Sequence, residues 1–288
     1  MRIPASFCGL VALKATRGRV PAYPPSVVWT LGHIGPIART VEDVALLLEH
    51  VSRPDHRDWN AAPYEPTPYR PRSRERPGAA LRIAVCLVAP GAAVDPAVRS
   101  AVSDATAALR PLCARLEVAQ PSWLDVRAPF EDYCDAGLAH GLRALDGHAR
   151  SRLDPGLRAT LDAAERVDRE RFLDAYDAQI RTGREARLFC ADWDFLITPT
   201  VATAPFAAGR DVPDPDRDRH WLDWTPFTYP FNFSGQPALT LPCGHTDDGL
   251  PIGLQIVADL WDEARLLALA RYLERELAWT PGRLDDDD

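Results

Sequence analysis

The sequence predicts an α/β fold, with a mixed β-sheet core flanked by helices. Residues 81–88 form a continuous apolar run of strand length, which is typical of a strand buried on both faces. A segment with apolar side chains at helical spacing follows from Asp95. Further apolar runs of strand length occupy residues 194–198, 239–242 and 252–258. Strands that alternate with helical segments indicate an α/β domain.

Helices are expected in four places. Thr40 has the side chain of an N-cap, and the apolar segment 41–51 after it predicts a buried helix. Asp95 and Pro96 supply a cap and a first-turn proline for the next helix. Residues 125–190 are rich in Ala and Arg and are expected to be mostly helical, and residues 262–277 predict a final amphipathic helix.

The remaining segments are expected to be irregular. Residues 1–38 are rich in Gly and Pro and predict loops and short strands. Residues 63–78 contain five prolines and four arginines, which indicates a surface linker between two lobes. The arginines suit a solvated face, with a basic docking patch as the alternative. Residues 285–288 are four aspartates, for which we expect a disordered tail.

Composition excludes several function classes. The net charge of −8 and the pI of about 5.4 argue against nucleic acid as a partner. No apolar run of 18 residues and no secretory signal are present, so we expect a cytoplasmic protein without a membrane span. The six cysteines are scattered, which predicts buried free thiols rather than a disulfide framework.

Motifs for metals, nucleotides and common hydrolases are missing from the sequence. There is no HExxH zinc motif, no GxGxxG or Walker loop, and no G-x-S-x-G elbow. We therefore expect no metal and no cofactor. A Cys–His or Ser–His pair that meets only in space stays open. The histidines form no motif and are expected to be structural or surface residues; they are His33, His50, His56, His140, His148, His220 and His245.

Two long segments carry a family resemblance. The first reads RIPASFCGLVALKATRGRVP from Arg2 and continues as GHIGPIARTVED from Gly32. The second reads NFSGQPALTLPCG from Asn232 and GLPIGLQIV from Gly249, and is preceded by DFLITP at 194–199. Both resemble the C-terminal portion of amidase-signature enzymes. Their glycines suit tight turns or close backbone approach.

The resemblance implies hydrolysis or transfer of the acyl group of an amide. The family uses a serine nucleophile, a second serine with a cis peptide bond, a lysine base and a glycine-rich oxyanion loop. Arg2 matches the arginine two places after the nucleophile, so the nucleophile matches the position before Met1. We therefore expect no catalytic residue in this chain and no activity of the chain alone.

Neither obvious replacement is expected to restore the catalytic set. Lys14 is the single lysine, and it matches a family lysine that is not the catalytic one. Ser6 lies out of register with the nucleophile, and contact between nucleophile and base requires about 3 Å.

Three interpretations stay open at this point. The chain is a partial amidase domain, a non-catalytic binding or scaffold remnant, or one half of a two-chain amidase completed by an N-terminal half. A small-molecule amide is the expected substrate of a completed enzyme, without prediction of its identity. Residues 125–230 resemble the family least and are expected to include pocket walls. An aromatic stretch there suits either an acyl pocket or core packing: Trp221, Trp224, Phe227, Tyr229 and Phe231.

Overall fold

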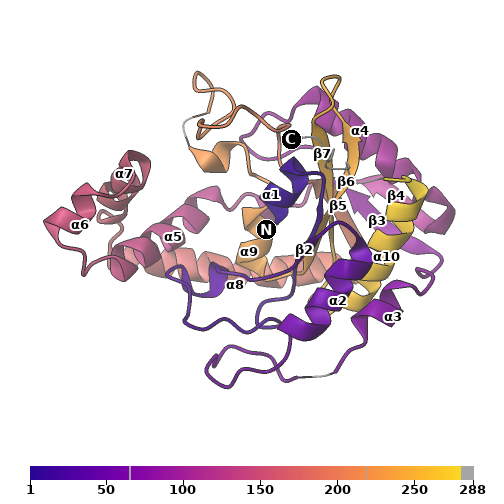
Figure 1. Ribbon diagram of the computed structural model, residues 1–288, viewed down its shortest axis with the longest axis horizontal. Helices are drawn as coiled ribbons and strands as arrows, with labels where there is room; N and C mark the ends of the chain where they lie inside the picture. Colours follow the sequence, from indigo (N-terminus) through magenta and orange to yellow (C-terminus); the bar gives the residue numbers. More distant parts are fainter. Residues whose placement is uncertain (65, 219, 280–288) are drawn as a thin grey trace, which may run out of the picture.

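One seven-stranded mixed sheet forms the centre of the protein (Figure 1). The computed structural model describes residues 1–64, 66–218 and 220–279. The strand order across the sheet is β2-β1-β6-β7-β5-β3-β4. Strand β3 runs parallel to β4 and β5, whereas the other pairs are antiparallel. The strands are β1 (Val11–Lys14), β2 (Ile37–Ala38), β3 (Leu81–Val85), β4 (Cys113–Val118), β5 (Phe195–Pro199), β6 (Ala238–His245) and β7 (Pro251–Val257).

Helices cover both faces of this sheet. In Figure 1, α2, α3 and α10 lie to one side of the strands, and α5–α8 extend to the other. The helices are α1 (Arg2–Phe7), α2 (Val41–Val51), α3 (Tyr69–Ser73), α4 (Pro96–Ala107), α5 (Arg127–Gly141), α6 (Gly147–Ser151), α7 (Pro155–Ala164), α8 (Arg169–Asp192), α9 (Tyr229–Ser234) and α10 (Glu263–Glu276). The mixed sheet and its helical layers confirm the predicted fold class.

Alternation along the strands divides the apolar interior in two. On β5, Ile197 packs with α2, α4 and α10, and Leu196 packs in a second cluster with Trp123 and Phe231. On β6, Leu239 packs in the first cluster and Ala238 packs in the second. Successive side chains of a strand point to opposite faces, so central strands that are apolar throughout bury both faces.

The expected caps and turns are present. Thr40 Oγ1 accepts a hydrogen bond from the Asp43 amide at 3.1 Å and begins α2. Asp95 caps α4 by accepting from the Ala97 amide at 2.9 Å. Strands β6 and β7, which contain two of the expected apolar runs, form an antiparallel hairpin around residues 246–250.

Several boundaries differ from the sequence expectation. The irregular start contains a helix, α1, which packs against β1, β6 and β7. The expected linker at 63–78 contains α3, whose Tyr69 is buried in the core, while Arg70 and Arg74 pair with Glu42 of α2. Tertiary contact therefore orders part of a proline-rich segment that has no local helical pattern. The expected acidic tail, 285–288, lies outside the described residues.

All six cysteines are free thiols, as expected. Their burial differs from the prediction, because Cys86 alone is fully buried and Cys8 is exposed. None of the helices within the described ranges combines the length and the apolar character needed to cross a bilayer.

Candidate functional site

The two segments singled out in the sequence meet at Arg2. Its guanidinium donates to Gln255 Oε1 on β7, to Asn232 Oδ1 on α9 and to the Thr228 carbonyl oxygen, the last at 2.8 Å. Arg2 and Gln255 are 253 positions apart in the sequence, and both are buried. A buried guanidinium needs several acceptors to offset its desolvation. Arg2 therefore ties α1, α9 and the centre of the sheet together.

Glycines allow the backbone to approach closely around this contact. A Cβ on Gly35 would lie 2.2 Å from the Leu13 carbonyl oxygen, and a Cβ on Gly253 would lie 2.3 Å from Ser6 Oγ. Both distances are far below van der Waals contact. Gly235 has φ +82° and ends α9 just before β6. These positions match the close approaches and the turn expected from the sequence.

Ser6 lies beneath β7 rather than in a cavity. It is 3% exposed and packs directly against Gly253. The Ser6 side chain is therefore enclosed between α1 and β7.

Two further cations, the buried Lys14 and the partly buried Arg17, lie near Arg2. Lys14, on β1, is 1% exposed and donates to the Ala15 carbonyl oxygen at 3.1 Å. Arg17 donates to the Phe233 carbonyl oxygen at 2.7 Å. Burial lowers the pKa of the Arg2 guanidinium to about 9. Burial, together with the charges of Arg2 and Arg17, holds the pKa of Lys14 well below its usual range.

His33 lies beside these cations with one ring nitrogen unpaired. Its Nδ1 donates to the Leu31 carbonyl oxygen at 2.9 Å. Its Nε2 is buried and has no hydrogen-bond partner within the described residues. Burial, followed by the charge of Lys14, holds the pKa of His33 well below its usual range. His33 is therefore neutral at pH 7, with Nε2 as a free acceptor.

Two cavities adjoin at His33. The smaller has a volume of about 170 Å³ and lies at the start of α1. Its polar lining includes Arg2, Lys14 and Thr228. Its apolar walls are Ile3, Pro4, Phe130, Trp221 and Tyr229.

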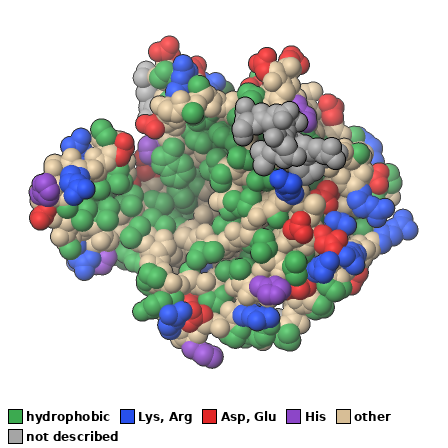
Figure 2. All heavy atoms as spheres, in the orientation of Figure 1, with side chains coloured by type: hydrophobic (Ala, Val, Ile, Leu, Met, Phe, Trp, Pro, Cys, Tyr) green, Lys and Arg blue, Asp and Glu red, His purple; other side chains and the backbone are tan. Residues whose placement is uncertain are grey.

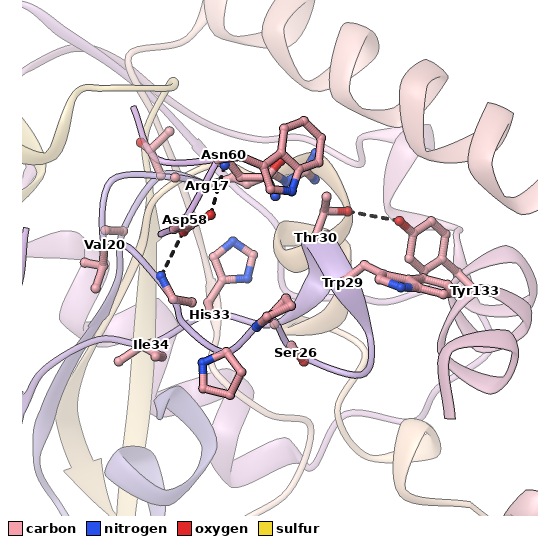
Figure 3. Close-up of a pocket in the computed structure, with 18 of the residues that line it drawn as sticks. Arg17, Val20, Ser26, Trp29, Thr30, His33, Ile34, Asp58, Asn60 and Tyr133 are labelled. Atoms are coloured by element: carbon pink, nitrogen blue, oxygen red, sulfur yellow. Dashed lines mark hydrogen bonds between the residues drawn. The ribbon is translucent and has the colours of Figure 1, made fainter. Parts of the chain in front are cut away.

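The larger cavity is an open cleft of about 820 Å³ (Figure 3). Trp29 forms one wall and makes edge contacts with Tyr133 and Phe172, at ring-centroid distances of 5.6 and 5.4 Å. Thr30 Oγ1 lies 3.1 Å from the Tyr133 hydroxyl. Figure 3 shows His33 near the middle of the view, with Trp29 and Tyr133 to its right.

A turn closes the far side of the cleft. Asp58 accepts hydrogen bonds from the Ala22 and Asn60 amides at 2.8 and 2.9 Å. The Ala62 amide donates to the Gly18 carbonyl oxygen at 2.8 Å, and Gly18 has φ +80°. The cleft therefore has a mostly apolar wall and a polar rim.

Most of the aromatic stretch before Asn232 is core. Phe227 and Phe231 are fully buried, and Trp224 stacks on Phe7 at 5.6 Å. Trp221 and Tyr229 line the smaller cavity. Core packing therefore accounts for four of the five aromatic residues, because Tyr229 is also buried in an apolar cluster.

Sequence reasoning missed the individual residues that form the cleft. Tyr133, Phe172 and Tyr176 come from α5 and α8, within the 125–230 region, but Trp29 comes from the segment expected to be loop. Phe172 and Tyr176 are four positions apart on one helix face, which is the available sequence signal. Trp29 has no such signal, because its φ of +46° and its contacts with two helices arise from the fold.

Comparison with known proteins gives consistent matches. Residues 1–267 match the family model described as Amidase. The chain is 36% identical to 6-aminohexanoate-cyclic-dimer hydrolase of Pseudomonas sp. (strain NK87), over 98% of this chain and 62% of that protein. It is 33% identical to a glutamyl-tRNA(Gln) amidotransferase subunit of Synechococcus sp. (strain CC9902), over 96% of this chain and 61% of that protein.

The three-dimensional match agrees. A structure of 6-aminohexanoate cyclic dimer hydrolase complexed with substrate superposes with a TM-score of 0.83 and 34% identity, covering 99% of this chain and 64% of that one. The chain thus spans less than two thirds of the length of these relatives.

Proposed function

Because this chain belongs to the amidase-signature family, we propose that it takes part in hydrolysis or transfer of the acyl group of an amide. The contact of Arg2 with Gln255 and Asn232 carries the proposal, since it joins the two segments that resemble the family. The similar hydrolase and amidotransferase support a reaction at a C–N bond.

The cleft suits an amide with an apolar chain or ring. Trp29, Tyr133 and Phe172 form a continuous aromatic wall, and the polar groups lie at its edge. Apolar surface in a concave site binds the hydrocarbon part of a ligand, and a few polar groups orient it. The Pseudomonas relative is a 6-aminohexanoate-cyclic-dimer hydrolase, so the cyclic dimer of 6-aminohexanoate is the first compound to test.

The catalytic residues are proposed to come from outside these 288 residues. A lysine base must contact the serine that it deprotonates. Lys14 is the single lysine in the sequence, and its one hydrogen bond within the described residues goes to the Ala15 carbonyl oxygen. The family resemblance likewise assigns no residue of this chain to the nucleophile, the second serine or the base.

The proposed site for the completing polypeptide includes an exposed apolar stripe on α8. Leu173, Tyr176, Ile180 and Leu188 are 52%, 46%, 56% and 63% exposed, at spacings that place them along one side of the helix. Exposed apolar stripes of this kind mark interaction surfaces. The occupant is a polypeptide that corresponds to the unmatched part of the relatives, on the same chain or a separate one.

The test is an assay of the chain with and without such a polypeptide. The 288-residue chain is purified alone, and again after coexpression with the part of the Pseudomonas hydrolase that it does not match. Ring opening of the cyclic dimer is then followed. We expect no turnover by the chain alone and turnover by the pair.

Two outcomes would contradict the proposal in different ways. Turnover by the chain alone would place the catalytic residues within it. A stable pair that binds the amide but never cleaves it would favour the non-catalytic binding remnant. The complex with a Phe172→Ala chain should show a raised KM, which would connect the activity to the cleft, because Phe172 lines the cleft and lies outside the α8 stripe.

A further inference from the structure

The smaller cavity holds an excess of buried positive charge. Arg2 is 5% exposed and Lys14 is 1% exposed, and both line it. Arg17 lies close enough to lower the pKa of Lys14 through its charge. In the described ranges, the hydrogen bonds of these three cations all end on neutral oxygens.

The one buried carboxylate nearby is already engaged. Glu263 Oε1 accepts from the Thr16 amide at 2.8 Å, and Oε2 lies 3.6 Å from Arg19 Nε. Glu263 raises the pKa of Lys14, but burial and the two arginines outweigh it. A charge that is buried without an opposite charge has a large desolvation cost, so the cavity favours an anion.

The shape and the donors of the cavity define the ligand. Its volume of about 170 Å³ excludes a large molecule, and the walls formed by Phe130, Trp221 and Tyr229 suit a short hydrocarbon group. In its protonated form, which a bound anion favours, Lys14 has three N–H donors, and one of them is used within the described residues, on the Ala15 carbonyl oxygen. We propose that the cavity between Arg2, Lys14 and His33 is a binding site for a carboxylate.

His33 and Lys14 are the groups that an anion in this site would favour in the protonated form. The charged groups that face His33 are Lys14, Arg17 and Arg2, all of them cations. A bound carboxylate supplies the opposite charge, although burial, the first cause of the low pKa of both groups, remains. Binding is therefore expected to take up a proton, which a merely structural cation cluster would not do.

Two sources can supply the carboxylate. One is a small molecule, such as a short acid that enters from the cleft at His33. The other is an aspartate or glutamate side chain of the polypeptide that completes the chain. The second source rests on the proposed function, because it needs the completing polypeptide, whereas the first is independent of the proposed amide chemistry.

The test compares butyrate with butyramide, which have the same number of heavy atoms. Calorimetry on the 288-residue chain is expected to show butyrate binding at least tenfold tighter than butyramide. The binding enthalpy should differ between two buffers of different ionisation enthalpy, because a proton is taken up. Equal affinities for the two compounds would overturn the proposal.

Two variants distinguish the contribution of the Lys14 charge to binding from that of the apolar cavity walls. Lys14→Met should reduce butyrate affinity at least tenfold and bring it to that of butyramide, whereas Arg99→Met, at an exposed arginine of α4, should leave it unchanged. Trp221→Ala, at a 42% exposed wall position, should weaken both compounds while the protein stays folded. Unchanged butyrate affinity in a folded Lys14→Met variant would overturn the proposal.

The completed protein distinguishes the two sources. If a small molecule is the natural ligand, butyrate binds the chain alone and the chain paired with its completing polypeptide. If a side chain is the natural ligand, butyrate binds the isolated chain and is excluded from the pair. Both results support a carboxylate site, and absence of selective binding to the isolated chain contradicts it.

Discussion

The layered core and the outer side of α8 differ in how completely their apolar residues are covered. Between the sheet and α2, α4 and α10, residues such as Leu254 and Leu269 are fully buried. On the outer side of α8, Ile180 and Leu188 remain more than half exposed. On the surface in Figure 2, charged side chains gather over the α3 and α10 side of the view, and hydrophobic ones gather across the middle.

This difference separates residues that stabilise the described fold from residues that are available for contact. Fully covered apolar residues contribute to the free energy of unfolding of the chain itself. Exposed ones contribute only when something else covers them. Substitutions in the two regions should therefore affect different measurements.

The largest effect is expected from truncation in the covered core. Leu254→Ala on β7 removes a fully buried side chain and should lower the free energy of unfolding by about 3 kcal/mol. The matched truncation Ile180→Ala, at a 56% exposed position, should change it by less than about 0.5 kcal/mol. Chemical denaturation of the three proteins measures both values, and equal losses would remove the distinction between the two regions.

A close backbone approach should give the next effect. Gly35→Ala places a Cβ 2.2 Å from the Leu13 carbonyl oxygen, so the chain must shift, at a cost of about 2 kcal/mol. Gly147→Ala is the control, because no atom lies within 4 Å of its added Cβ and the position is in α6. The control should be neutral or slightly stabilising. Thermal unfolding of both variants tests this prediction. Equal midpoint temperatures would contradict the close backbone approach at Gly35.

A smaller effect should depend on pH. Burial, followed by Glu131 and Asp132, raises the pKa of Asp135 to about 6. The folded state thus disfavours the charged carboxylate above pH 6, and this penalty fades as the pH falls towards 4. Asp135→Asn should stabilise the protein by about 1 kcal/mol at pH 7.5, after allowance for solvent screening, and leave it unchanged near pH 4. Denaturation at both pH values tests this, and a pH-independent gain would exclude the ionisation as its cause.

The smallest effect on stability should accompany a large effect on association. Ile180→Ser should leave the unfolding of the chain almost unchanged but weaken binding of a completing polypeptide to the α8 stripe. Leu173→Ser, near the start of α8 in the same stripe, should also weaken this binding. Binding measured by light scattering or calorimetry provides the test. Full affinity in both variants would place the contact elsewhere.

Local sequence signals determined most of the secondary structure. The Thr40 cap, the Asp95-Pro96 start and the apolar runs of β3 and β5 each depend on a few neighbouring residues, so the sequence alone predicts them. The long segments from Arg2 and from Asn232 indicated the family in the same way, through residue order. The short helices α1 and α3 were missed because contacts with the sheet and with α2 and α10 stabilise them.

Only the tertiary structure decided the site. It brought Arg2 to Gln255 across 253 positions, left Lys14 without an ion pair among the described residues, and set Trp29 against α5 and α8. Burial and charge balance depend on which distant segments pack together, and no local pattern records that. The sequence by itself determined what kind of protein this is, and packing decided where its charges and its cleft lie.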